Sequence, residues 1–135
     1  MIDMWLSARL AATLHKGIRR NPQLVKAKDV IKMLTCDAAK GLGLGESLGS
    51  LEVGKEADML LLNCQQAHLK PMFDVYSHLA YAFGRHDVES TFVAGKCVMD
   101  KGKVLNLNET EIFSKVDALA EDIKATMKHN DLTKP

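Results

Sequence analysis

The chain has 135 residues, the usual length of one domain, and its 47% apolar and 26% charged residues can support a hydrophobic core. The formal net charge of +1 provides no strong field to attract nucleic acid or anionic lipid. No apolar run approaches the roughly 20 residues that span a bilayer. We therefore expect neither a nucleic acid nor a membrane as a partner.

The three cysteines, Cys36, Cys64 and Cys97, are odd in number and far apart, and no Cys-x-x-Cys occurs. This pattern favours neither a disulfide framework nor a thiolate zinc site. The first residues also lack the basic segment and apolar block of a secretory signal. We expect free, buried thiols in a reducing cytosol, and hence a cytoplasmic protein.

Near the N-terminus, apolar side chains recur every four residues, which predicts a helix. They are Ile2, Leu6, Leu10 and Leu14, with Trp5 beside them. Gly17 and Asn21-Pro22 should end this helix. No leader or capping residue precedes it, so we expect a further segment of the protein before Met1.

Two more helices are predicted before the glycine-rich stretch. Residues 24–34 carry apolar side chains at helical spacing. Thr35 is a suitable N-cap for a short third helix, and Gly41 or Gly43 can form its C-cap.

The second half of the chain mixes short strands with helices. The apolar run Met59–Leu62 predicts a strand buried on both faces, and Asp74 should cap a short helix that ends at Gly84. Residues 88–94, 97–99 and 104–105 predict a meander with turns at Gly95 and Gly102.

A long helix is predicted after Asn108, which can cap it together with Glu111. Its apolar stripe consists of Ile112, Val116, Leu119, Ile123 and Met127. Residues 130–135 should fray. The chain by itself is therefore predicted to be α+β, with too few strands for a complete sheet, so its strand edges should need partners.

The sequence offers several candidate sites, and each has a simpler structural reading. The run Gly41–Gly45 could cradle a phosphate, but a helix precedes it where a strand is required, so we favour a helix C-cap and loop.

Asp74 and His78 share a helix face, yet two ligands are too few for zinc. We favour a helix cap and a hydrogen-bonded histidine there. Asp58 could have a raised pKa beside a buried strand, but we favour an Asx-type role on the turn at 54–56.

The remaining histidines do not form a recognisable motif. His15, His68, His86 and His129 are scattered, and the sequence contains no His-x-His, His-Glu-x-x-His or Gly-x-Ser-x-Gly. The residues alone therefore predict no catalytic constellation.

Three stretches carry a family resemblance: residues 34–44 continued by 49–62, residues 71–82, and residues 87–105. The string Gly-Ser-Leu-x-x-Gly-Lys-x-Ala-Asp at 49–58 is the most specific part. Together the stretches resemble the C-terminal third of the amidohydrolase superfamily. The string Pro-x-x-Asp-x-x-Ser-His-Leu at 71–79 is similar to the branch of methylthioadenosine/adenosylhomocysteine deaminases and chlorohydrolases.

The resemblance implies an α/β fold, in which a TIM-like barrel joins a composite β-sandwich built from both ends of the chain. Residues 1–46 would be terminal helices of the barrel, and residues 47–108 would be sandwich strands with an inserted helix. Residues 109–135 would be an appended amphipathic helix with a frayed tail. A complete barrel takes about 250 residues, so we expect this chain to be a C-terminal fragment.

The resemblance also implies a chemistry. A divalent metal, zinc or iron, would be held by barrel histidines and an aspartate, and would activate water for hydrolytic deamination of a purine nucleoside or similar N-heterocycle. None of those ligands is present here, and Asp3 belongs to the helix that follows the barrel aspartate. We therefore expect no catalytic residue and no bound metal in this chain, which should be inactive alone, and its substrate-binding residues are unknown.

Other readings stay open. The chain could be a non-enzymatic interaction module or the C-terminal subunit of a split amidohydrolase, because its unfinished sheet would seek a second chain. A homo-oligomer, or pairing with the missing N-terminal part, is expected in either case. A nucleotide-binding module that uses the glycine run is a third alternative. The sequence does not choose between an amine and a chloride as leaving group.

Overall fold

The computed structural model describes residues 3–132 and separates into two units, 1–103 and 104–135. Among the described residues, the first helical segments in chain order are α1 (Met4–Arg19), α2 (Ala27–Lys32), the π-helical turn η1 (Met33–Asp37), α3 (Ala38–Gly41), the 3-10 turn η2 (Ala67–Leu69) and α4 (Val75–Tyr81). A second 3-10 turn, η3 (Arg85–Asp87), leads into the sheet. The second unit carries one helix, α5 (Glu109–Leu132).

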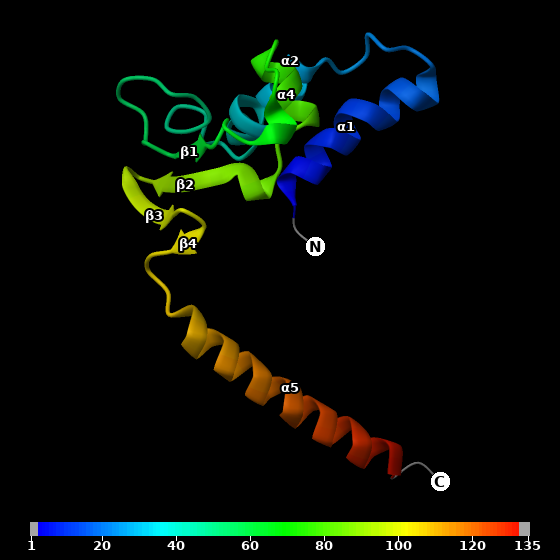
Figure 1. Ribbon diagram of the computed structural model, residues 1–135, viewed down its shortest axis with the longest axis vertical. Coiled ribbons are helices and arrows are strands. Elements are labelled where there is room, and N and C mark those ends of the chain that lie inside the picture. Colours follow the sequence, from blue (N-terminus) through cyan, green and yellow to red (C-terminus); the bar gives the residue numbers. More distant parts are fainter. Residues whose placement is uncertain (1–2, 133–135) are drawn as a thin grey trace. The chain divides into compact units, whose positions relative to one another are not determined.

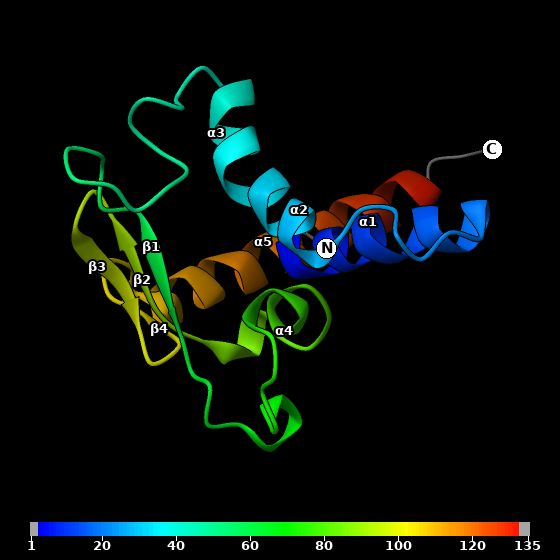
Figure 2. The same ribbon diagram turned by 90° about the horizontal axis from the view of Figure 1, so that it is seen from above.

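The sheet has four strands in the order β1-β2-β3-β4. They are β1 (Met59–Leu62), β2 (Val88–Val93), β3 (Lys96–Asp100) and β4 (Lys103–Val104). β2 pairs antiparallel with both β1 and β3. Helices α1, α2 and α4 lie together to one side of this sheet (Figures 1 and 2). The mixed α+β character that the sequence predicts is therefore confirmed.

Small side chains let α1 pack closely on its neighbour. Ala8 and Ala12 of α1 are buried and form a core with Val30 of α2. Trp5 Nε1 donates a hydrogen bond to the carbonyl oxygen of Leu79 in α4 (3.0 Å). The described leucines of the four-residue repeat are exposed; they are Leu6, Leu10 and Leu14. The helix is as predicted, but it is the alanine face that packs within this chain.

The start of α1 corrects one expectation. Asp3 accepts a hydrogen bond from the Leu6 amide (3.0 Å), so the helix does have an N-cap. At the other end Arg20 takes a left-handed conformation with φ 49°, and its amide bonds to the Gly17 carbonyl oxygen. The predicted end of the helix is therefore confirmed to within a few residues, while Ile2 lies outside the described residues.

Thr35 is not an N-cap. Residues 27–41 form one uninterrupted helical stretch, because α2, η1 and α3 follow one another directly. The Thr35 hydroxyl donates to the Ile31 carbonyl oxygen (2.8 Å), a local bond that satisfies the side chain inside a helix. The stretch ends at Gly41, and the Leu44 amide bonds back to the Ala39 carbonyl oxygen (2.8 Å). The glycine run is thus a helix C-terminus with carbonyl oxygens to satisfy, which does not suit a phosphate.

The β1 strand forms where predicted, but it is not buried on both faces. Leu60 and Leu61 are exposed, and β1 stands at the edge of the sheet. The two predicted turns are confirmed as two-residue hairpin turns with positive φ at both positions. They are Ala94-Gly95 (φ 48° and 74°) and Lys101-Gly102 (φ 48° and 76°).

Two helix caps are also as predicted. Asp74 accepts from the Ser77 amide (2.7 Å) at the start of α4, and Asn108 accepts from the Glu111 amide (3.3 Å) at the start of α5. Helix α4 ends at Tyr81, three residues before the predicted Gly84. Helix α5 continues to Leu132, and residues 133–135 lie outside the described part, so the fraying expected from residue 130 stays a prediction.

Candidate functional site: the His68, His86 and Asp87 cluster

Asp87 is the centre of a polar cluster at the entry to β2. It ends the turn η3 and is almost completely buried, at 1% exposure. The turn is closed locally, because the Gly84 amide donates to Asp87 Oδ2 (2.8 Å) and the Asp87 amide donates to the Gly84 carbonyl oxygen (3.0 Å). A buried carboxylate needs such partners, since burial without them is costly.

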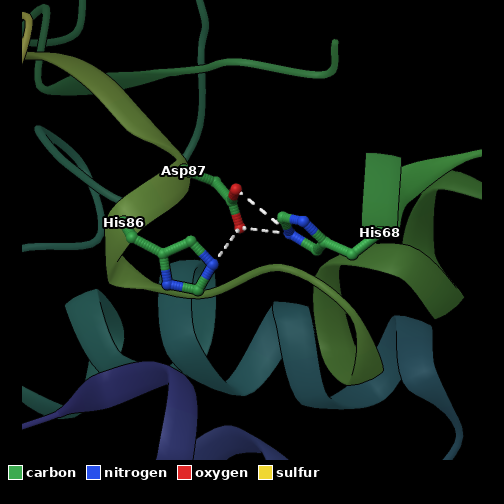
Figure 3. A group of neighbouring side chains, drawn as sticks. All are labelled: His68, His86 and Asp87. Carbon is green, nitrogen blue, oxygen red and sulfur yellow. Dashed lines mark hydrogen bonds and ion pairs between the residues drawn. The ribbon is translucent and has the colours of Figure 1, made fainter. Parts of the chain in front are cut away.

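Two histidines converge on this carboxylate. His68 Nε2, from η2, lies 3.2 Å from Oδ1 and 3.2 Å from Oδ2 of Asp87, and His86 Nε2 lies 3.4 Å from Oδ2 (Figure 3). The two imidazole rings are 5.4 Å apart between centroids. Among the side chains that the structure describes, these three form the one group of potential metal ligands whose donor atoms all lie within 4.8 Å of one another.

The two oxygens of Asp87 are not equally satisfied. Oδ2 receives the Gly84 amide and the approach of both histidines, whereas Oδ1 is buried and has no hydrogen-bond partner of good geometry. An unsatisfied buried oxygen costs about 1–3 kcal/mol. The cluster therefore has spare capacity to bind a donor or a cation.

The cluster was not foreseen from the sequence. His68 and Asp87 are 19 positions apart, and their proximity depends on the tertiary structure. His15 lies on α1, exposed and outside the cluster, and the side chain of His129 lies outside the described part. The adjacent His86-Asp87 pair was the one available signal, and it is too short to carry a prediction.

The other predicted candidates have structural roles. His78 Nδ1 lies 2.9 Å from the Asp74 carbonyl oxygen, while the Asp74 carboxylate caps α4, so the favoured reading of this pair is confirmed. Hydrogen bonds from the Ser77 hydroxyl and the Ser77 amide hold the pKa of Asp74 below its usual value. All three cysteines are free, but they are only partly buried.

Asp58 corrects a prediction. Its Oδ1 accepts from the Ala94 amide (2.7 Å) in the turn between β2 and β3, and not from the turn at 54–56. The Gly95 amide also bonds to the Ala57 carbonyl oxygen (3.1 Å). The Ala-Asp pair therefore fixes a hairpin that is 36 residues away in the chain, which the local sequence could not reveal.

The rest of the 49–58 string also builds structure. Lys55 Nζ donates to the Gly45 carbonyl oxygen and to Ser50 Oγ, both at 2.8 Å, and so closes the loop between α3 and β1. Gly49 has φ 94°, and a Cβ there would lie 2.8 Å from the Ala39 Cβ. The side chains of this string hold a loop against a helix, and none of them approaches the histidine cluster.

Comparison with known proteins identifies the fold family. The sequence profile described as "Amidohydrolase family" matches residues 1–98. The chain belongs to the amidohydrolase family. It is 41% identical over 115 residues to a 5-methylthioadenosine/S-adenosylhomocysteine deaminase of Moorella thermoacetica, covering 85% of this chain and 27% of that protein. It is 39% identical over 124 residues to a 5'-deoxyadenosine deaminase of Methanosarcina acetivorans, covering 92% and 28%.

Solved structures of this family have the same local fold. An adenosine deaminase from Xanthomonas campestris with bound zinc matches with a TM-score of 0.85 and 28% identity, over 90% of this chain and 28% of that one. An atrazine chlorohydrolase from Arthrobacter aurescens matches with a TM-score of 0.76 and 22% identity, over 85% and 26%, which shows the fold alone. The family and branch that the sequence strings indicated are confirmed, and the chain spans less than a third of the length of these relatives.

The ligand motif that the family resemblance implies for the barrel metal is not found in this sequence. The expected His-x-His pair is absent from the sequence, and the histidine cluster draws its ligands from two short turns beside a sheet. No catalytic step through a family metal follows from these residues. None of the helices described combines the length and the hydropathy needed to cross a membrane.

Proposed function

We propose that the protein to which this chain belongs is a metal-dependent hydrolase that deaminates a purine nucleoside or a similar N-heterocycle. The observation that carries the proposal is the similarity, over most of this chain, to deaminases of 5-methylthioadenosine, S-adenosylhomocysteine and 5'-deoxyadenosine. The free thiols support a reducing compartment, the cytoplasm. Zinc is the metal of choice to test, because the similar adenosine deaminase carries it.

In this proposal the chain supplies structure and not chemistry. Residues 1–46 belong to the barrel domain, residues 47–108 to a composite sandwich, and residues 109–135 to an appended helix. The active centre of such a barrel lies at the C-terminal ends of its strands, and no barrel strand is among the elements described here. We therefore expect no deaminase activity from the chain alone.

The direct test compares two proteins for ammonia release. One is the 135-residue chain, and the other is the product of any open frame that continues upstream of the Met1 codon. The substrates are 5'-deoxyadenosine, 5-methylthioadenosine, S-adenosylhomocysteine and atrazine, with and without zinc. Deamination by the longer protein alone supports the proposal. Ammonia release by the short chain would overturn the assignment of chemistry to other residues, and chloride release from atrazine alone would overturn the substrate class.

An exposed apolar surface on α1 favours a second candidate function, that of a subunit that binds another chain. The exposed stripe on α1, Leu6, Leu10, Leu14 and Ile18, is a large apolar area on a helix whose opposite face is packed. Monomeric proteins rarely expose such contiguous apolar patches. A separate barrel-bearing chain would cover it if the protein is one subunit of a split amidohydrolase. Co-purification with such a chain, lost in a Leu10→Glu variant, would support this alternative, whereas a stable homodimer would favour a non-enzymatic module.

A further inference from the structure

We infer that His68, His86 and Asp87 form a divalent-cation site, with Zn²⁺ as the preferred ion. The inference does not rest on the proposed deaminase function. It revises the expectation that this chain binds no metal. Three observations carry it: the spacing of the donor atoms, the unsatisfied oxygen of Asp87, and the exposure of the histidines.

The spacing of the donors suits a tetrahedral ion. Zn²⁺ binds histidine nitrogen and carboxylate oxygen at about 2.0–2.2 Å, so two ligand atoms on one tetrahedron are about 3.4 Å apart. His68 Nε2 lies 3.2 Å from both oxygens of Asp87, and His86 Nε2 lies 3.4 Å from Oδ2. All three donor atoms lie within 4.8 Å of one another, so one ion could take all three as ligands, with water as the fourth.

The electrostatics of Asp87 favour a cation. The carboxylate is buried; its Oδ1 lies 3.2 Å from His68 Nε2 but makes no hydrogen bond of good geometry, whereas Oδ2 accepts from the Gly84 amide and lies within 3.4 Å of both histidines. A bound cation would offset the charge of the carboxylate and would coordinate one of its oxygens. The imidazole nitrogens supply the remaining donors, so the carboxylate is the one acidic ligand of the site, as in mixed His and Asp sites for zinc.

A cation can reach the cluster from solvent. The side chains of His68 and His86 are 43% and 69% exposed. A hollow of about 370 Å³ opens onto His86 and Asp87 and is also lined by Glu89 and Lys101. A second hollow, of about 450 Å³, touches both histidines, but its lining has two arginines, Arg9 and Arg85, against one acid, Asp3. The first hollow has two acids, Asp87 and Glu89, against Lys101, and is therefore the approach.

Calorimetric titration of the metal-free chain with Zn²⁺ tests the site. One ion should bind per chain, and His68→Ala and His86→Ala should each weaken the affinity at least about tenfold, since even partners outside the ligand set change affinity by about 10–100-fold. His15→Ala is the matched control, because His15 is exposed on α1 and outside the cluster. Co²⁺ in place of Zn²⁺ should show a tetrahedral absorption spectrum that is lost in His86→Ala.

His86→Ala is the decisive variant, because its exposed ring can be removed with the least disturbance of the core. Far-UV circular dichroism of each variant separates loss of a ligand from loss of the fold. The inference is overturned if Zn²⁺ does not bind saturably, or if binding is equal in the parent chain, His68→Ala and His86→Ala. A parallel loss in His15→Ala would also overturn it, because the ion would then be bound elsewhere.

Discussion

Helices α1 and α5 are both amphipathic in sequence, yet only one of them buries a face in the structure. α1 places Ala8 and Ala12 against Val30, and Trp5 reaches the backbone of α4. α5 has a regular apolar stripe, but every member of it is exposed: Ile112, Val116, Leu119, Ile123 and Met127. Periodicity therefore predicts a helix reliably and does not reveal whether its apolar face is buried within the helix's own unit.

α1 buries a face and α5 does not because the side chains on the packed face of α1 are small and because α2 lies next to it. Alanines let the backbone of α1 approach α2, and the larger leucines of α1 remain exposed like those of α5. The core of the first unit is small and is completed by Leu69, Ala80 and Phe83. Stability should therefore depend strongly on these few side chains and weakly on the stripe of α5.

The largest expected effect is a difference in the free energy of unfolding between alanine substitutions at two phenylalanines, one buried and one exposed. Phe83 is 2% exposed and Phe113 of α5 is 63% exposed. Phe83→Ala should lower the free energy of unfolding by about 3–5 kcal/mol, because it removes a buried ring and leaves a cavity. Phe113→Ala should change it by less than about 0.5 kcal/mol. Urea denaturation of both variants measures the two values, and equal losses would contradict the contrast between the buried core of the first unit and the exposed side chains of α5.

Two valines, one buried and one exposed, test the same contrast with a smaller side chain. Val30 is 1% exposed and Val116 is 55% exposed. Val30→Ala should cost about 2 kcal/mol, the transfer free energy of two methyl groups plus a small cavity. Val116→Ala should be nearly neutral in the free chain. A cost at Val116 that appears only at high protein concentration would instead mean that the stripe of α5 packs against another copy.

The cap of α5 should matter locally. Asn108 Oδ1 accepts from the Glu111 amide at 3.3 Å, and its removal leaves that amide to water. Asn108→Ala should lower the free energy of local opening in the first turn by about 1 kcal/mol. Hydrogen exchange of the backbone amides at 109–112 measures this, with Asn106→Ala as a control outside the cap. Unchanged exchange in Asn108→Ala would show that the cap does not stabilise the helix.

Local signals predicted the parts of the fold that depend on a few neighbouring residues. The caps at Asp74 and Asn108 and the turns at Gly95 and Gly102 are where the sequence placed them. Each of these is decided by one side chain or one positive φ within four residues. The continuous helix through Thr35 is the exception, because a hydroxyl can cap a helix or bond back to the previous turn with similar ease.

Contacts between residues that are far apart in the sequence could not be predicted in this way. The Asp58 bond to Ala94 crosses 36 positions, and the bond between His68 and Asp87 crosses 19. The motif that contains Asp58 was specific enough to indicate the family, although its physical role became visible only in the folded chain. The candidate metal cluster had no comparable motif, so only tertiary structure could bring it to attention.

The smallest expected effect is a pH dependence of the α4 cap, which is a carboxylate, that the neutral cap of α5 lacks. Hydrogen bonds from the Ser77 hydroxyl and amide hold the pKa of Asp74 below the usual value of about 3.9. The cap therefore contributes its full stability above that value and loses it as the pH falls through the lower folded-state pKa. Asn108 carries no such charge, so its cap has no transition of its own.

Ser77→Ala tests the cause of this shift. Removing the hydroxyl should raise the pKa of Asp74 toward its usual value and move the acid loss of the α4 cap to higher pH, because the carboxylate keeps only the amide partner. Titration of the Asp74 carboxyl by carbon NMR measures the change. Ser114→Ala on α5, whose hydroxyl bonds only to the Thr110 carbonyl oxygen, is the matched control and should leave the titration unchanged. If Ser77→Ala also left it unchanged, the amide alone would account for the lowered pKa, and the difference between the two caps would lie in the backbone.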